Sequence, residues 1–246
     1  MEPVRLLWTA GFDSTYRLLE LMQAGRTVQP YYVIDRDRRS YPIELQRIAE
    51  LRRLIAARYP EPARLRPVAI TLRDDLSIEP DLQEAWDTLA RQTHIGTQYL
   101  WLAQFCHHAG FPDGSVKLCM PRIDPPHPLQ LIKFEDLDAE ELRLRPGAPQ
   151  VLFRFYAWPT RHASKADMRT AAVERGFWDI LQRSWFCHTP VGPEPCGHCG
   201  PCRIARVQRE DVSFAGPATL RLAAWRARSR LRRLGRALGG GPKPAP

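Results

Sequence analysis

The chain has 246 residues, of which 44% are hydrophobic and 26% are charged. This balance is typical of a globular protein of one large domain, with or without an appendage, and it excludes wholesale disorder, collagen-like and coiled-coil architectures. The formal net charge is +9, but eight positive charges and no Asp or Glu lie between residues 216 and 246, so the rest of the chain carries about +1.

Two features bear on the compartment. The sequence contains no run of 18 or more apolar residues, and Met1–Arg5 lack the basic and apolar stretches of a secretory signal, so we expect a cytoplasmic protein. Four of the six cysteines are clustered near the C-terminal end. In a reducing compartment, such a cluster indicates a metal site before it indicates disulfides.

Strands and helices are expected to alternate from the N-terminus. Residues 4–8 form an apolar run that predicts a strand, and a small-residue turn leads from it into a helix that Gly25 is expected to cap. Residues 28–34 and 68–72 predict two further strands, with a helix around residues 48–55 between them. This alternation favours an α/β fold built from βαβ units on a parallel sheet.

The middle of the chain gives weaker patterns. Residues 82–90 and 97–109 predict helices, residues 115–120 and 151–158 predict strands, and the Pro-rich residues 121–149 carry no clear pattern. Farther on, the segment Ser164-Lys165-Ala166-Asp167 resembles a capping box, with Asp in place of the usual Glu or Gln. The helix that it opens is expected to end near Gly176.

A turn that could bind phosphate follows the first predicted strand, and it reads Thr9-Ala10-Gly11-Phe12-Asp13-Ser14-Thr15. A helix N-terminus directs several backbone N–H groups at one point, and small residues let a phosphate approach the backbone closely. Ser14 and Thr15 could add hydroxyl donors, and Asp13 could orient a Mg²⁺ ion bound to the phosphates. The turn is neither a Walker A loop nor a dinucleotide-binding fingerprint, so an ordinary polar turn remains the alternative.

Four cysteines form a second candidate site with the spacing Cys187-x8-Cys196-x2-Cys199-x2-Cys202. Four thiolates complete the tetrahedron that Zn²⁺ prefers and leave no open position, so we expect a structural zinc ion. A disulfide pair or unrelated buried thiols are the alternative.

Two histidines near this cluster and the two remaining cysteines are weaker candidates for metal ligands. His188 and His198 could substitute as ligands, but with four thiols available we interpret them as exposed turn residues. Cys106 and Cys119 are isolated in the sequence and are interpreted as core residues.

Together these motifs resemble a known family. The turn from Thr9 to Ser14 is similar to the SGGxDS loop of the ATP pyrophosphatase (PP-loop) superfamily, with Thr9 in place of Ser and Ala10 in place of Gly. The four-cysteine spacing, the ending Cys196-Gly197-His198-Cys199-Gly200-Pro201-Cys202-Arg203 and the segment Pro159…Ser164-Lys165-Ala166-Asp167…Gly176 are similar to the QueC-like 7-cyano-7-deazaguanine synthase family. The resemblance covers roughly residues 4–206 and is thin between about 60 and 150.

The resemblance implies a fold and a reaction. The fold is a Rossmann-like (HUP-type) parallel sheet flanked by helices, with an ATP-binding α/β domain at 1–180, a zinc-binding segment at 181–215 and a basic amphipathic tail at 216–246. The reaction is the ATP-dependent adenylation of the carboxylate of 7-carboxy-7-deazaguanine, or of a close analogue. Attack by an amine then forms an amide, which a second ATP-dependent step can dehydrate to the nitrile preQ0.

The resemblance also implies site residues, with ATP, Mg²⁺ and structural Zn²⁺ as cofactors. The catalytic residues would be Asp13, Ser14 and Lys165, although Lys165 could equally be a surface residue at a helix start. The ATP-binding residues would be Thr9, Ala10, Gly11, Phe12, Asp13, Ser14, Thr15 and, near the adenine, Ile34. The zinc ligands would be Cys187, Cys196, Cys199 and Cys202.

Two segments depart from the family where substrate would lie. They are Asp35-Arg36-Asp37-Arg38 and His94-Ile95-Gly96-Thr97-Gln98-Tyr99. This divergence fits QueC-like relatives encoded in antiviral (CBASS) operons, in which a deazaguanine carboxylate is joined to an amine on a protein. The acceptor is therefore open between ammonia and a protein amine. The alternatives are a PP-loop tRNA-modifying enzyme that uses Cys106 and Cys119, and a catalytically inactive nucleotide-binding adaptor.

The tail predicts an amphipathic helix. Its apolar stripe consists of Leu220, Ala224, Ala227, Leu231, Leu234 and Leu238, with arginines around it. We expect an accessory helix that packs on the body or on a partner, with contact to nucleic acid or to an anionic membrane left open. A homodimer is also open, and the residues from Gly239 onward are expected to be disordered.

Overall fold

We describe the protein from a computed structural model, over residues 2–61, 64–93, 95–122, 151–208, 212, 214 and 216–238, with side chains described up to residue 231. The expectations for His94, for most of residues 121–149 and for the chain from Gly239 onward lie outside the described residues. The chain forms two compact units, Met1–Asp37 with Tyr41–Trp185, and Arg38–Ser40 with Phe186–Pro246. Among the described residues, no helix combines the length and the apolar character needed to cross a membrane.

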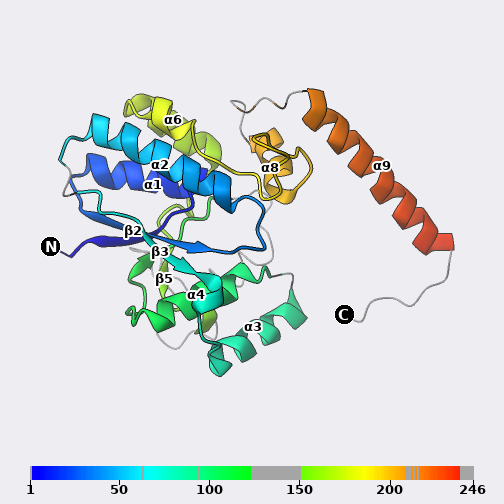
Figure 1. Cartoon of the computed structure of the whole chain (residues 1–246), viewed down its shortest axis with the longest axis horizontal. Helices are drawn as coiled ribbons and strands as arrows, with labels where there is room; N and C mark the ends of the chain where they lie inside the picture. Colours follow the sequence, from blue (N-terminus) through cyan, green and yellow to red (C-terminus); the bar gives the residue numbers. More distant parts are fainter. Residues whose placement is uncertain are drawn as a thin grey trace. The chain divides into compact units, whose positions relative to one another are not determined.

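The first unit is built on a five-stranded parallel sheet in the order β3-β2-β1-β4-β5 (Figure 1). The strands are β1 (Val4–Leu7), β2 (Val28–Ile34), β3 (Ala69–Leu72), β4 (Val116–Lys117) and β5 (Tyr156–Ala157). In chain order, β2 and β3 lie on one side of β1, and β4 and β5 lie on the other side. In open α/β sheets, ligands bind beyond the carboxyl ends of the strands where this order reverses, here between β1 and β4. The predicted α/β class with a parallel sheet is confirmed.

Helices cover both faces of this sheet (Figure 1). The helices in the described residues are α1 (Phe12–Gln23), α2 (Tyr41–Arg58), η1 (Arg73–Asp75), α3 (Pro80–Gln92), α4 (Gln98–His108), η2 (Val151–Phe153), α6 (Lys165–Glu174), α7 (Trp178–Leu181), α8 (Gly200–Gln208) and α9 (Gly216–Leu238). Leu6 packs with α1, α2 and α6 in one buried cluster, and its neighbour Leu7 packs with α3 and α4 in another. Neighbouring strand residues point to opposite faces, so the two clusters lie on opposite sides of the sheet.

Two helix boundaries follow from local sequence as predicted. Gly25 has φ +69° just after α1, where a left-handed residue ends the helix. At α6, the Ser164 hydroxyl accepts a hydrogen bond from the Asp167 backbone N–H, and the Asp167 carboxylate accepts one from the Ser164 backbone N–H. This reciprocal capping box fixes the first residue of α6 as Lys165.

The strand predicted over residues 151–158 is wrong in its extent. The structure has the 3-10 turn η2 there, followed by the two-residue strand β5. The run is apolar because Leu152, Phe153, Phe155 and Trp158 are all buried, whatever their backbone conformation. A fully buried run has no periodicity that separates strand from turn. The strand predicted over 115–120 is likewise reduced to β4.

Candidate active site and metal centre

Two hydrogen bonds hold the corner between β1 and α1 in place. Trp8 is fully buried, and its indole Nε1 donates a hydrogen bond to the hydroxyl of Thr15, 3.0 Å away in α1. The Ala10 carbonyl accepts a hydrogen bond of 2.8 Å from the backbone N–H of Trp185. Ala10 itself has φ +55°, the one positive φ of a non-glycine residue in the part of the chain that the structure describes. The corner therefore has the left-handed backbone that glycine adopts most readily.

Gly11 leaves space at the corner and has an ordinary φ. Its φ is −70°, and a Cβ atom there would lie 3.2 Å from the Thr9 hydroxyl oxygen and 3.7 Å from that of Ser14. Gly11 is also the residue before α1, and no side chain caps the helix. The N-terminus of a helix directs its first backbone N–H groups along the helix axis, here toward this corner. Together with the helix dipole, they make the corner favourable for an anion.

Lys165 reaches the corner from α6. Its Nζ lies 2.6 Å from Asp13 Oδ1, and the two side chains are only 13% and 21% exposed. The Lys165 Nζ also lies 5.2 Å from the centre of the Phe12 ring, within the range of a cation–π contact. Both residues occupy the first turn of a helix, α1 for Asp13 and α6 for Lys165. The structure thus brings together two residues that are 152 positions apart in the sequence.

The other predicted ATP-binding residues fall into two groups. Thr9 is exposed, and Gly11 is partly exposed, so both can meet a ligand. Ala10, Phe12 and Thr15 are buried, and the Thr15 hydroxyl accepts the hydrogen bond from Trp8. The side chain of Thr15 therefore positions the corner, and that of Phe12 packs in the core.

Ile34 and Ser14 complete the predicted set. Ile34 is the last residue of β2 and packs partly buried against the cluster that contains Leu6. Since β2 pairs in parallel with β1, Ile34 lies at the same carboxyl edge of the sheet as the corner. Ser14 is 8% exposed, and its hydroxyl donates a hydrogen bond to the Gly11 carbonyl at 3.3 Å.

Sequence reasoning missed an ionic cluster at the end of β2. Arg73, in η1 just after β3, lies 2.7 Å from the carboxylates of both Asp35 and Asp37, and these contacts raise the pKa of the arginine further. Asp35 and Asp37 belong to the segment Asp35-Arg36-Asp37-Arg38, which differs from the corresponding segment of the resembled QueC-like family. Arg73 therefore links the loop after β2 to the end of β3 through ion pairs. The local sequence around residue 73 contains no signal that predicts these ion pairs.

The four cysteines come together in the second unit. Their sulfur atoms all lie within 4.8 Å of one another, and Cys187, Cys196 and Cys202 are fully buried. The Cys196–Cys202 and Cys187–Cys199 sulfur pairs are 3.8 and 4.0 Å apart. A tetrahedral zinc ion with Zn–S bonds of about 2.3 Å places its sulfurs about 3.8 Å apart. The spacing is thus that of a metal site, and it is far longer than a disulfide bond of about 2.05 Å.

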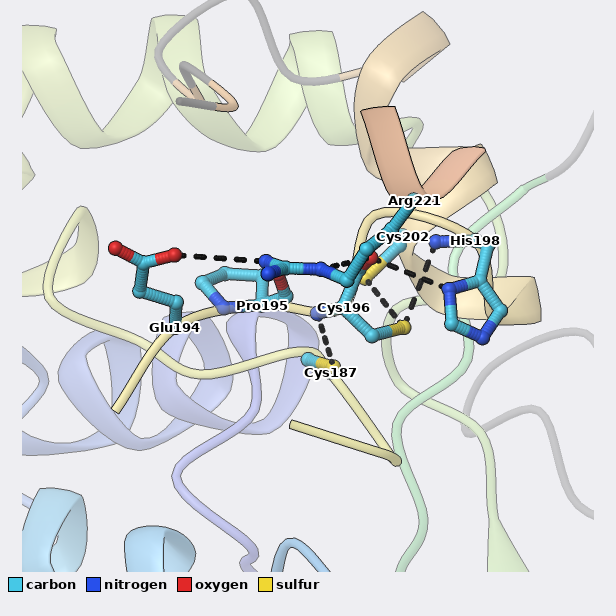
Figure 2. Close-up of polar contacts among 7 residues, drawn as sticks. All are labelled: Cys187, Glu194, Pro195, Cys196, His198, Cys202 and Arg221. Carbon is cyan, nitrogen blue, oxygen red and sulfur yellow. Dashed lines mark hydrogen bonds and ion pairs between the residues drawn. The ribbon is translucent and has the colours of Figure 1, made fainter. Parts of the chain in front are cut away.

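Backbone N–H groups support the thiols. Cys196 Sγ accepts from the N–H group of His198 at 3.4 Å, and Cys187 Sγ accepts from that of Cys196 at 3.2 Å (Figure 2). Cys196 Sγ also accepts from the N–H group of Cys199 at 3.3 Å. Hydrogen bonds with the Cys187 and Cys202 side chains lower the pKa of Cys199, and the bonds within this trio raise the pKa of Cys187 and of Cys202. The backbone donors stabilise the thiolate form, which binds zinc.

The histidines beside the cluster are not among its ligands. The group of side chains placed to hold a metal consists of the four cysteines, and among the described residues it includes no histidine. The ring Nδ1 of His198 instead lies 3.2 Å from the Cys196 carbonyl oxygen, as Figure 2 shows. The cysteines predicted from spacing can therefore hold a structural zinc ion as a complete four-thiolate set.

The start of α9 packs against this cluster. Gly197 has φ +84°, and a Cβ atom there would collide with the carbonyl oxygen of Ala218 in α9. Arg221 donates hydrogen bonds to the Cys196 and Pro195 carbonyls at 3.2 and 3.1 Å and lies 3.4 Å from the Glu194 carboxylate (Figure 2). The first turns of the tail helix thus belong structurally to the four-cysteine segment.

The search for related proteins leaves the function open. No protein-family model matches the chain, and a search of curated proteins finds no match. Function has to be argued from the geometry of the two sites and from the motifs in the sequence.

Proposed function

We propose that the protein is an ATP-dependent C–N bond-forming ligase of the QueC-like 7-cyano-7-deazaguanine synthase type, with an ATP-binding domain of the Rossmann-like HUP type. Its substrate is the carboxylate of 7-carboxy-7-deazaguanine or of a close analogue. The observation that carries the proposal is the Asp13–Lys165 pair at the N-terminus of α1, beyond the carboxyl end of β1. The carboxylate of Asp13 could bind a metal ion and the amine of Lys165 could bind a phosphate, both at the N-terminus of a helix.

The phosphates of ATP would occupy the corner. The backbone N–H groups at the start of α1 and the exposed Thr9 hydroxyl would donate to phosphate oxygens. Lys165 would exchange its contact with Asp13 for one with a phosphate, and Asp13 would be free to hold Mg²⁺. A bound Mg²⁺ supplies charge neutralisation on the departing pyrophosphate.

The reaction joins a carboxylate to an amine in two steps. A carboxylate oxygen attacks the α-phosphorus of ATP, the bond to the bridging oxygen breaks, and pyrophosphate leaves. The amine nitrogen then attacks the acyl carbon, AMP leaves with the carboxylate oxygen, and the amine loses a proton. Positioned donors at the corner would stabilise the charge that develops on pyrophosphate, where each donor contributes about 10²–10³ in rate.

The acceptor is either ammonia or an amine of a protein. Arg73, Asp35 and Asp37 form an ionic cluster at the end of β2, where the family carries a different segment. This altered edge supports an acceptor or an acyl substrate that differs from those of a housekeeping nitrile synthase. We therefore propose amide formation as the common step, with dehydration to the nitrile as a possible second step.

The tRNA-modifying alternative needs a reactive cysteine pair. Burial raises the pKa of both Cys106 and Cys119 to about 12, so both are protonated thiols and poor nucleophiles at neutral pH. Cys106 packs in the cluster with Leu7, whereas Cys119 packs against the cluster with Leu6, on the opposite face of the sheet. These positions favour the ligase over a tRNA thiolation enzyme.

The test measures the products that the protein forms from ATP. The protein is incubated with ATP and Mg²⁺, with 7-carboxy-7-deazaguanine, with tRNA or with neither, and AMP and pyrophosphate are measured. We expect AMP that depends on the deazaguanine carboxylate. AMP that depends on tRNA would favour the modifying enzyme, and no AMP under any condition would favour an inactive adaptor.

A matched pair of variants tests the role of Lys165. Lys165→Met should lower kcat/KM for AMP formation by about 10²-fold or more, because the transition state loses a cation. Arg169→Met removes a cation from the same helix, where it lies over the Trp178 ring, and should leave the rate within about twofold. Equal rates for the two variants would remove Lys165 from the mechanism.

A further inference from the structure

Helix α9 uses one face to pack within its unit. Ala218 and Leu222 are only 2% and 5% exposed, and the guanidinium of Arg203 lies 5.0 Å from the centre of the Trp225 ring. Arg221 adds its contacts with the Cys196 and Pro195 carbonyls. Residues 218, 222 and 225 are spaced by four and three positions, so they share one side of the helix.

The opposite side carries an exposed apolar stripe, which we define as Leu220, Ala224, Ala227 and Leu231. Leu220 is 71% exposed and Leu231 is 67% exposed, and both alanines are exposed as well. The sequence predicted that this stripe packs on the body or on a partner. In the described part of the chain, the contacts of α9 with the four-cysteine segment come from the other side of the helix.

Arginines flank the stripe on both sides. At about 100° per residue, Arg228 falls about 40° beyond one border of the stripe and Arg230 about 60° beyond the other. Both side chains are exposed. The sequence from Gly216 to Leu238 contains no Asp or Glu. The outward side of α9 therefore combines an apolar centre with positively charged borders.

We propose that α9 lies flat on an anionic lipid surface, with the stripe inserted among the acyl chains and the flanking arginines on the lipid headgroups. Charge complementarity and the exposed leucines together favour this occupant. An anionic bilayer can bind both the arginines and the apolar stripe, because its headgroups bind the arginines and the boundary of its acyl chains buries the leucines. A nucleic acid would bind the arginines but leave the leucines in water.

The four-cysteine segment fixes the orientation of the helix. Because Ala218, Leu222 and Trp225 are held on the inner side, the stripe faces away from the four-cysteine segment before any lipid is met. A pre-oriented helix loses less conformational entropy on binding than a free peptide does. The zinc site then serves membrane attachment as well as the fold of its own unit.

The test is co-sedimentation of the full-length protein with large vesicles of neutral phosphatidylcholine, or of phosphatidylcholine with 30% phosphatidylglycerol. Binding should require the anionic lipid and weaken as salt increases. Leu220→Glu with Leu231→Glu should lower the partition coefficient by about tenfold or more. Arg228 and Arg230 changed together to Gln should weaken the preference for the anionic vesicles.

The control variant is Ile78→Glu. Ile78 is 71% exposed, as Leu220 is, but it lies in the first unit, so its replacement should leave vesicle binding unchanged. Absence of binding to anionic vesicles at low salt would overturn the proposal. So would binding that the two leucine replacements do not weaken, or tighter binding to a short RNA or DNA duplex that depends on the arginines alone.

Discussion

Ala10 stands where the chain turns from β1 toward α1, in a left-handed conformation with φ +55°. An L-residue with a Cβ atom adopts this region at a cost of about 1–2 kcal/mol, and the resembled family has glycine at this position. The strain is maintained by surrounding contacts, which include the hydrogen bond from Trp185 and the buried indole of Trp8. Strain of this kind is characteristic of functional corners.

This strain predicts the effect of Ala10→Gly. The free energy of unfolding should be unchanged or higher, because release of about 1–2 kcal/mol of strain offsets the cost of glycine, about 0.5–1 kcal/mol. The matched control is Ala103→Gly in α4, which is equally buried but helical and should lose about 1 kcal/mol. Urea denaturation compares the two, and equal losses would show that Ala10 is unstrained.

At the scale of elements, the segment around the four cysteines depends on one close approach between backbones. Gly197 combines φ +84° with a position where any Cβ atom collides with the Ala218 carbonyl oxygen. The same turn positions the N–H groups that donate to Cys196 Sγ. The metal site and the docking of α9 are therefore coupled through a single glycine.

Replacement of Gly197 tests this coupling. Gly197→Ala should cost about 2–3 kcal/mol, reduce zinc from about one ion per chain and make α9 more susceptible to cleavage by trypsin, because the helix loses its packing. Gly200→Ala is the control, because a Cβ atom at Gly200 has no neighbour within 4 Å. Elemental analysis and limited proteolysis measure both effects. A Gly197→Ala protein with full zinc and a protected α9 would refute the coupling.

Local signals predicted some elements and missed others. The β1–α1 corner and the cysteine spacing could be predicted, because each is encoded within about 16 consecutive residues. Helix α8 was missed because it overlaps the metal-binding motif, although Pro201 beside its first residue is a helix-start signal. The pairing of Lys165 with Asp13 and the outward direction of the α9 stripe depend on contacts between distant segments, which sequence patterns do not encode.

At the scale of the whole molecule, the two candidate sites lie in separate units. The sheet unit contains the Asp13–Lys165 corner, and the second unit contains the four cysteines and the tail helix. The two faces of α9 differ, because Ala218 and Arg221 pack on the four-cysteine segment while the opposite face carries the exposed stripe.

Two truncations follow from this division. A chain that ends at Leu231 keeps the contacts of Ala218, Arg221 and Trp225, so zinc content and AMP formation should match those of the full protein. A chain that ends before Gly216 loses those contacts, and it should release zinc to a chelator at least about tenfold faster. AMP formation is measured in both. Loss of activity in the longer chain, with its fold preserved, would contradict an accessory role for the tail.

The most direct measurement follows one oxygen atom. The deazaguanine substrate is labelled with ¹⁸O in its carboxylate, and the AMP released by the protein in the presence of ATP, Mg²⁺ and ammonia is analysed by mass spectrometry. An acyl adenylate that breaks down by amine attack transfers one labelled oxygen to AMP. Singly labelled AMP is the predicted result, and unlabelled AMP, or ADP in its place, would contradict adenylation of the carboxylate.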